Sequence, residues 1–141
     1  MTKSKKNKRT AIYSGSFDPI HEGHLSILIK ANALFDKVYV VVSNNPDKNS
    51  NSLEMRAQQI QQFLQDHNVQ FDVIINSGLT VDIAHQLDAH YLIRGLRNEL
   101  DLKYELALAQ QNQKLAPDIE TVFFLADADK VQISSTSIRN K

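Results

Sequence analysis

The sequence predicts a single α/β domain: a Rossmann-like, doubly wound parallel sheet of five strands with helices on both faces. Five short apolar runs rich in β-branched or aromatic residues alternate with four helix-length amphipathic stretches, the pattern typical of βαβ units. The 141 residues suffice for one core-forming domain, and the chain has no cysteine for a disulfide framework. Because crossovers between parallel strands are right-handed, this alternation favours a doubly wound sheet.

Each expected strand is a short run of apolar, β-branched or aromatic residues. In chain order the strands are expected at Ala11–Ser14, Val38–Ser43, Phe71–Ile75, Tyr91–Arg94 and Thr121–Leu125. Strands that alternate with helices in one domain form a mostly parallel, helix-covered sheet. The carboxyl ends of its strands meet at one edge, and ligands of such sheets bind there.

The expected helices fill the intervals between these strands. They are His21–Phe35, Leu53–Gln65, Val81–Leu87 and Glu99–Leu115. Ser52 is a candidate N-cap for the second helix, since its hydroxyl can accept a hydrogen bond from a free helix N–H. The last helix carries apolar residues on two faces, Leu100, Tyr104 and Leu108 on one and Leu102, Leu106 and Ala109 on the other. Two apolar faces suit either a subunit contact or packing within one subunit.

Charge is distributed unevenly although the formal net charge is zero. Five of the sixteen Lys and Arg residues lie within residues 1–9, and the remainder carries eleven basic against sixteen acidic residues. We interpret residues 1–9 as a basic, disordered tail and residues 10–141 as the folded domain. A basic tail can contact nucleic acid, but the acidic body argues against broad nucleic-acid binding. Without a membrane-length apolar run or a signal-peptide h-region, we expect a cytoplasmic protein that has no membrane contact.

The most informative motif is Gly-Ser-Phe-Asp-Pro-Ile-His-Glu-Gly-His at residues 15–24, directly after the first strand. A small-residue turn that leads into a helix presents unpaired N–H groups at the positive end of the helix dipole, which favours phosphate binding. Ser16 adds a hydroxyl, and His21 and His24 share one face of the new helix. The two histidines lack the third ligand of a zinc site, so phosphate binding outranks metal ligation and no residue is assigned to a metal.

A second group of phosphate-compatible residues follows the fourth strand. Arg94 and Arg97 flank Gly95, which lets the backbone approach a ligand. Their guanidinium groups offer forked donors suited to phosphate. Alternatively, one of these arginines pairs with Glu99 or Asp101 at the start of the next helix.

Two other strand-end loops carry weaker signals. Ile133–Arg139 contains four successive hydroxyl residues, which can cap a helix or face a phosphate or a nucleobase. Lys48, in the loop after the second strand, would by itself be a solvated surface lysine. The chain lacks both a Gly-x-Gly-x-x-Gly run and a P-loop run, so neither a dinucleotide-binding dehydrogenase nor a P-loop ATPase is favoured.

Three motifs together resemble the nucleotidyltransferase superfamily marked by an H-x-G-H tetrad: residues 15–24, Ile93-Arg-Gly-Leu-Arg97 and Ile133-Ser-Ser-Thr136. Within it, the chain is most similar to the bacterial phosphopantetheine adenylyltransferases. The stretch Ile93-Arg-Gly-Leu-Arg-Asn-Glu-Leu-Asp-Leu-Lys-Tyr-Glu-Leu-Ala-Leu-Ala-Gln carries this closer resemblance. The loop at Asn49–Ser52 is shortened relative to the family pattern, which weakens the alignment of Lys48.

The resemblance implies roles for particular residues. His24 would bind the ATP phosphates and stabilise the transition state, and Lys48 would lie near the reacting phosphates; these are the two expected catalytic residues. Ser16 would contact both substrates, and Lys48, Thr80 and Arg94 would join it around 4'-phosphopantetheine. His21 is left with a supporting or packing role. The other expected ATP contacts are Phe17, Gly95, Leu96, Arg97, Glu105, Lys130, Val131, Gln132, Ile133, Ser134, Ser135 and Thr136.

The implied reaction is adenylyl transfer from ATP to 4'-phosphopantetheine, which gives dephospho-coenzyme A and pyrophosphate in coenzyme A biosynthesis. Because the nucleophile is already an anionic phosphate, direct in-line attack without a covalent intermediate needs no general base. Mg²⁺ bound with ATP and a homo-oligomer, a hexamer in the family, are also implied. Two alternatives stay open: another nucleotidyltransferase that acts on nicotinate mononucleotide or a polyol phosphate, and a nucleotide-binding regulator that uses the basic tail.

Overall fold

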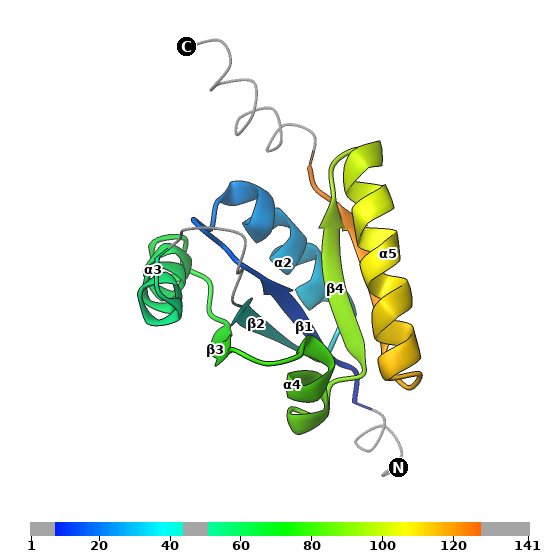
Figure 1. Cartoon of the computed structure of the whole chain (residues 1–141). Helices are drawn as coiled ribbons and strands as arrows, with labels where there is room; N and C mark the ends of the chain where they lie inside the picture. Colours follow the sequence, from blue (N-terminus) through cyan, green and yellow to red (C-terminus); the bar gives the residue numbers. More distant parts are fainter. Residues whose placement is uncertain (1–7, 44–50, 128–141) are drawn as a thin grey trace.

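The computed structural model describes residues 8–43 and 51–127. Within these ranges, strands and helices alternate along the chain (Figure 1). In order they are β1 (Thr10–Gly15), α2 (Glu22–Leu34), β2 (Lys37–Ser43), α3 (Leu53–Asp66), β3 (Asp72–Asn76), α4 (Thr80–Gln86), β4 (Tyr91–Leu96), α5 (Glu99–Leu115) and β5 (Glu120–Leu125). All the predicted strands and helices are confirmed, and no boundary differs from its prediction by more than two residues.

The strands form one parallel sheet in the order β3-β2-β1-β4-β5. From β1 to β3 the chain moves outward on one side, and it then returns past β1 to place β4 and β5 on the other side. This is the predicted doubly wound arrangement. The reversal between β1 and β4 creates a crevice beyond the carboxyl ends of these two strands, where α/β sheets bind their ligands.

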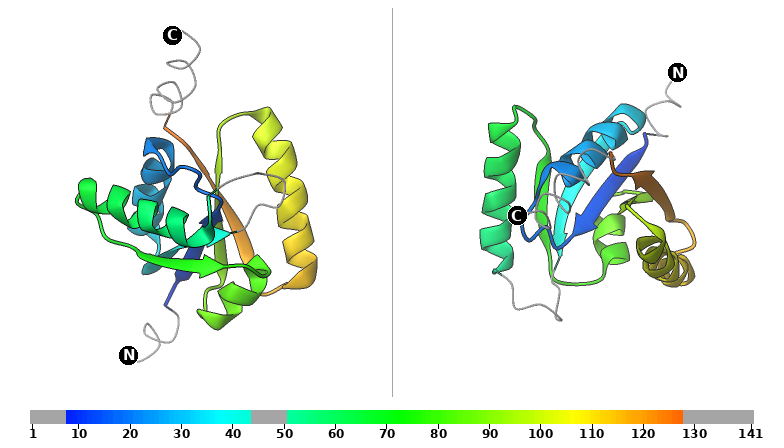
Figure 2. Two further views of the ribbon diagram at one scale, coloured as in Figure 1. Left: turned by 60° about the vertical axis from the view of Figure 1, so that its left-hand side comes forward. Right: turned by 90° about the horizontal axis from the view of Figure 1, so that it is seen from above.

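Helices cover both faces of the sheet (Figure 2). On one face, Leu28 of α2 and Ile60 of α3 belong to the same buried cluster as Tyr13 of β1. On the other face, Val81 of α4 packs in a second cluster that includes Ile12. Ile12 and Tyr13 are neighbours in sequence but belong to opposite layers, because successive side chains of a strand point to opposite faces. Both faces of β1 are therefore buried, as expected for the central strand.

Helix α5 leaves much of its apolar surface uncovered in the single chain. Leu100 is 79% exposed and Tyr104 is 67% exposed, whereas Glu105 is the buried residue of the helix. Leu102 and Leu106, on the second apolar face, are also exposed. Packing against the described residues of one subunit therefore does not account for these side chains.

Candidate active site

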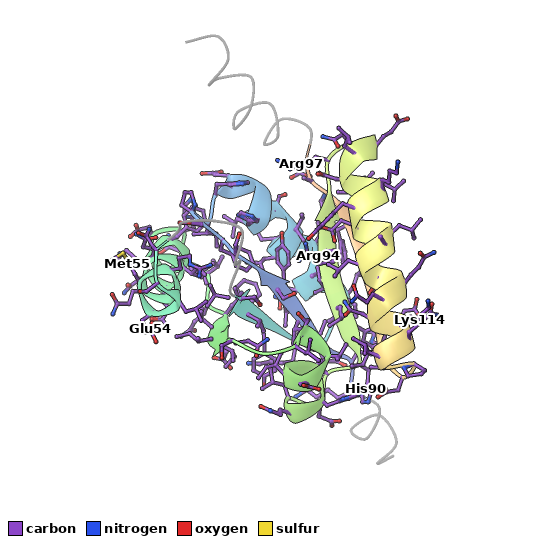
Figure 3. All side chains as sticks on the ribbon, in the orientation of Figure 1. Glu54, Met55, His90, Arg94, Arg97 and Lys114 are labelled. Carbon is purple, nitrogen blue, oxygen red and sulfur yellow. The ribbon has the colours of Figure 1, made fainter. Side chains whose placement is uncertain are left out.

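A cavity of about 740 Å³ opens at the carboxyl edge of the sheet. The end of β1 and the loop after it, the first turn of α2, the ends of β2 and β4, the start of α4 and one face of α5 line it. Figure 3 places Arg94 and Arg97 toward the carboxyl end of β4, between α2 and α5. The cavity therefore occupies the crevice that the strand order creates.

Most of the described residues expected in the site line this cavity. They are Ser16, Phe17, His24, Thr80, Arg94, Gly95, Arg97 and Glu105. Leu96 is the exception, because this last residue of β4 is not among the described lining residues. The predictions for Lys48 and for residues 130–136 lie outside the described residues.

The two histidines of the motif form the cap of helix α2. The backbone N–H of Gly23 donates to Nδ1 of His21 at 3.0 Å, and the backbone N–H of His21 donates to Nδ1 of His24 at 3.1 Å. Their rings lie 4.0 Å apart between centroids. Because each Nδ1 accepts a hydrogen bond, the proton of each neutral ring is on Nε2. His21 and His24 therefore each offer one Nε2–H donor.

Gly23 is required for this cap on steric grounds. A Cβ atom at this position would lie 2.9 Å from Cε1 and 3.1 Å from Nδ1 of His21. The imidazole of His21 thus occupies the space that any other side chain would need. The His-x-Gly-His spacing is explained by this cap, in which one ring folds over the α-carbon of the second helical residue.

An aromatic cluster supports the ring of His24. The ring of Phe17 lies 4.9 Å from that of His24 and 5.2 Å from that of Tyr13, with edge-to-face geometry in both pairs. Phe17 is buried and has φ of 46°, in the left-handed region that bulky residues rarely adopt. Packing on both sides of the ring holds this strained loop in place.

Burial sets the ionisation of the histidines. Burial, followed by the positive charges of His21, Arg97 and Arg94, lowers the pKa of His24 to about 3. Burial, followed by the charge of Arg97, also lowers the pKa of His21. His24 is therefore neutral at pH 7 and acts as a hydrogen-bond donor rather than as a cation.

Both arginines of the cavity are paired with carboxylates. Nε and Nη2 of Arg94 each donate to Glu105 at 2.6 Å, and Nη1 donates to the carbonyl oxygen of Ser14 at 2.6 Å. Nε of Arg97 donates to Asp101 at 2.9 Å. The pairing of one arginine with Asp101 is thus confirmed. The pairing of Arg94 with Glu105 was not predicted, since these residues were expected to contact different substrates.

Two further residues, Asn76 and Gly95, shape the cavity wall. Asn76 folds the loop before α4 by accepting from the N–H of Gly78 and donating to its carbonyl oxygen, both at 3.1 Å, which sets the position of Thr80 at the helix start. Gly95 allows close packing of β4 on α2, because a Cβ atom there would lie 2.2 Å from Cδ1 of Ile27. The sequence predicted a close approach of the backbone at Gly95 to a ligand, and the close approach seen within the described residues is to this side chain.

Sequence reasoning missed Arg56, which is 1% exposed. Its Nη1 donates to the carbonyl oxygens of Ser16 at 2.8 Å and Ser43 at 3.0 Å, and its Nε donates to that of Asn51 at 2.9 Å. Arg56 falls on the buried face of α3 with Ala57, which is an unusual position for an arginine. The one signal for this role in the sequence was a cation on the apolar face of a predicted helix. Its partners could not be predicted, because the carbonyl oxygens of Ser16 and Ser43 lie far from Arg56 in the sequence.

Among the described residues, no group of three or more His, Cys, Asp or Glu side chains is arranged to hold a metal ion. In the same part of the chain, no helix is long and apolar enough to cross a membrane. The arrangement offers neutral N–H donors, guanidinium groups and hydroxyls around one cavity. Such a set binds and orients phosphate groups.

Comparison with known proteins places the chain in a family. The cytidylyltransferase-like family model matches residues 12–141. The phosphopantetheine adenylyltransferase of Mycoplasma mycoides subsp. mycoides SC is 47% identical over 133 residues, which cover 93% of this chain and 94% of the relative. That of Clostridium novyi is 45% identical over 133 residues, which cover 93% of this chain and 81% of the relative.

Solved structures agree on the fold. A lipopolysaccharide core biosynthesis protein from Thermoplasma volcanium GSS1 has a TM-score of 0.60 at 20% identity, covering 86% of this chain and 98% of that protein. The pantoate-beta-alanine ligase of Francisella tularensis has a TM-score of 0.61 at 15% identity, covering 86% of this chain and 60% of that protein. The sequence relatives are much closer than these structures, and with the family model they show that the chain belongs to the phosphopantetheine adenylyltransferase family of cytidylyltransferase-like nucleotidyltransferases.

Proposed function

We propose that this chain transfers the adenylyl group of ATP to 4'-phosphopantetheine, which yields dephospho-coenzyme A and pyrophosphate in coenzyme A biosynthesis. Membership of the family and the phosphate-binding character of the cavity support this reaction. The observation that carries it is the imidazole cap of α2. It gives His21 and His24 one Nε2–H donor each, and both residues line the cavity.

The transfer proceeds by direct in-line attack. A phosphate oxygen of phosphopantetheine forms a bond to the α-phosphorus of ATP, the bond from that phosphorus to the bridging oxygen of the β-phosphate breaks, and pyrophosphate leaves with the electron pair. The nucleophile is already an anion, so no general base and no covalent intermediate is needed. Catalysis consists of holding two anions in line and stabilising negative charge on the transferred group.

In this proposal His24 is the central donor to the ATP phosphates. Its Nε2–H is fixed by the hydrogen bond to Nδ1 and by the ring of Phe17. A neutral ring with a low pKa donates without a competing change of ionisation near pH 7. We further propose Lys48 as the second catalytic residue, and Phe17, Gly95, Leu96, Arg97 and residues 130–136 as further ATP contacts.

Arg94 is proposed to bind the phosphate of phosphopantetheine together with Ser16, Lys48 and Thr80. A guanidinium group has five N–H donors. Three of those of Arg94 are used by Glu105 and by the carbonyl oxygen of Ser14. One N–H on Nη1 and one on Nη2 therefore remain for a phosphate. Glu105, expected from the resemblance to contact ATP, would in addition orient Arg94.

Mg²⁺ is proposed to enter with ATP. This ion keeps several of its waters and binds nucleotides mainly through their phosphate oxygens, with one or two carboxylates at most. Asp18, which lines the cavity, is the kind of single carboxylate that such a hydrated ion uses. The ion would supply charge neutralisation on the leaving pyrophosphate.

We also propose a homo-oligomer, a hexamer by resemblance, in the cytoplasm. The exposed apolar side chains of α5, with Leu100 and Tyr104 the most exposed, supply a surface suited to a second copy. Light scattering coupled to size-exclusion chromatography tests this: L100E combined with Y104E should lower the mass in solution. An unchanged mass would assign the contact to another surface.

The function is tested by measuring pyrophosphate release from Mg²⁺-ATP with 4'-phosphopantetheine, nicotinate mononucleotide and a polyol phosphate offered separately. Release with phosphopantetheine alone is expected, and H24A serves as the control for release by contaminants. Release with one of the other acceptors alone would assign the chain another nucleotidyltransferase reaction. Binding of ATP without release in any arm would instead favour a nucleotide-binding regulator.

A further inference from the structure

The described residues that line the cavity do not by themselves make it positive. Arg94 and Arg97 are its two lining cations, and Asp18, Asp101 and Glu105 are its three lining carboxylates. Both arginines are paired with a carboxylate. A site that receives ATP and a phosphate ester nevertheless needs positive charge close to its walls.

Arg56 lies directly behind this wall. It is 1% exposed, and within the described parts of the chain no carboxylate forms an ion pair with it. Its three hydrogen bonds to described residues all go to backbone carbonyl oxygens, which carry no net charge to compensate that of the guanidinium group. A buried and unpaired charge is costly unless a partner arrives, and anionic substrates are such partners.

The carbonyl groups that Arg56 binds belong to the site. Ser16 and Ser43 both line the cavity, and Nη1 of Arg56 bridges their carbonyl oxygens at 2.8 and 3.0 Å. One guanidinium group therefore joins the loop after β1 to the end of β2. Nε also holds Asn51 at 2.9 Å, just before the N-cap of α3. The planar fork of arginine suits this geometry, and the single ammonium of lysine does not reproduce it.

We propose that Arg56 is a positioning residue for adenylyl transfer, which fixes the Ser16 loop against the end of β2 and places an uncompensated positive charge behind the phosphate site. The proposal rests on the proposed function for the identity of the reaction. It adds a residue of α3 to a site otherwise built from the strand ends, α2, α4 and α5. Arg56 acts by holding the Ser16 loop and through the electrostatic field of its guanidinium group.

Two substitutions separate geometry from charge. R56K keeps the charge and loses the fork, so the Ser16 loop shifts. We expect kcat to fall about tenfold, since small misplacements of reacting groups are costly, while the KM for ATP stays within about threefold. R56Q also removes the charge, so the Kd of ATP measured by titration calorimetry should rise as well. Its kcat should be at or below that of R56K.

The matched control is L64A, on the same helix. Leu64 is 3% exposed in the core and makes none of these loop contacts. L64A should lower the melting temperature while kcat, measured well below that temperature, stays within about twofold of wild type. If L64A loses kcat as R56K does, or if R56K retains wild-type kcat, Arg56 has a structural role alone. Failure of both Arg56 variants to fold would likewise assign Arg56 a structural role and overturn the proposal.

Failure of the proposed function is distinguishable from failure of this proposal. If the wild-type protein uses nicotinate mononucleotide or a polyol phosphate instead, the same comparison of kcat and KM is made with that acceptor. If no acceptor is used, the Kd of ATP tests whether the charge of Arg56 contributes to phosphate binding. Equal Kd values for wild type and R56Q would overturn that part of the proposal.

Discussion

The Nδ1 atom of His24 accepts a hydrogen bond from the backbone N–H of His21 at 3.1 Å. One side of the His24 ring is thereby used to cap helix α2, and the other side keeps its proton for a ligand in the cavity. The same residue thus links the local structure of the motif to the proposed chemistry. Structural and catalytic effects of substitutions here must be measured separately.

His24→Ala should lower kcat by roughly 10²-fold or more, as expected for the loss of one donor to the transition state. Loss of the capping contact should cost about 1 kcal/mol of folding stability. Steady-state pyrophosphate release and urea unfolding measure the two effects. Adenylyl transfer that stays within a few-fold of wild type in a folded His24→Ala protein would show that the role assigned to His24 is wrong.

Stability should fall between pH 7 and pH 4.5, in part because of His24. Its pKa is about 3 in the folded protein and about 6.5 in an unfolded chain. Between these values the unfolded chain binds more protons, so its free energy falls relative to the folded state as the pH decreases. As the pH falls from 7 to 4.5, the urea concentration at the midpoint of unfolding should therefore decrease less for His24→Gln than for wild type. An equal decrease of the midpoint in both proteins would contradict the lowered pKa of His24.

Gly23→Ala should lower kcat about tenfold or more, because its Cβ would displace the ring of His21 that lies 2.9 Å away. Stability should change little, since the lost cap costs about 1 kcal/mol and alanine favours a helix by a similar amount over glycine. Gly78→Ala is the matched control, because a Cβ there meets only Oδ1 of Asn76 at 3.8 Å. Similar activity of the two variants would exclude the steric explanation of the motif.

Glu105→Gln should raise the KM for phosphopantetheine and lower the melting temperature. The side chain of Glu105 is 9% exposed, and removing one partner of a buried ion pair typically costs about 3–5 kcal/mol. The control is Asp101→Asn, whose pair with Arg97 is much more exposed and is worth about 1 kcal/mol or less. Thermal unfolding and acceptor titrations compare the two variants, and an equal effect on both would show that the Arg94 pair has no special role.

Removal of residues 1–8 should leave kcat/KM within about twofold of wild type. The folded chain is anchored from Arg9, whose N–H donates to Asp36 at 2.7 Å and whose carbonyl oxygen accepts from the N–H groups of Asp36 and Lys37. A hydrogen-bonded backbone at this point marks where a truncation should stop. Loss of activity on deletion would instead support a function that depends on the basic tail.

The elements of this fold could be predicted because their signals are local. Val38–Ser43 is an apolar β-branched run, and Ser52 is a local N-cap whose hydroxyl accepts from the N–H of Met55 at 3.1 Å. Strand–helix alternation then implies a parallel sheet, and that sheet brings the residues after β1 and β4 to one edge. The motif at residues 15–24, the two arginines at and just after the end of β4 and the family resemblance were accordingly available from the sequence.

Which side chains pair within the site was decided by the tertiary structure. Arg94 could have been matched with any nearby carboxylate, and the direction in which α5 leaves β4 brings Glu105 to it. Arg56 becomes a bridge between Ser16 and Ser43 because α3 packs against β3 and β2, which brings this side chain to the end of β2 and the loop after β1. The low pKa of His24 likewise arises from burial. Pairing and burial depend on distances between segments far apart in the chain, which local sequence patterns do not contain.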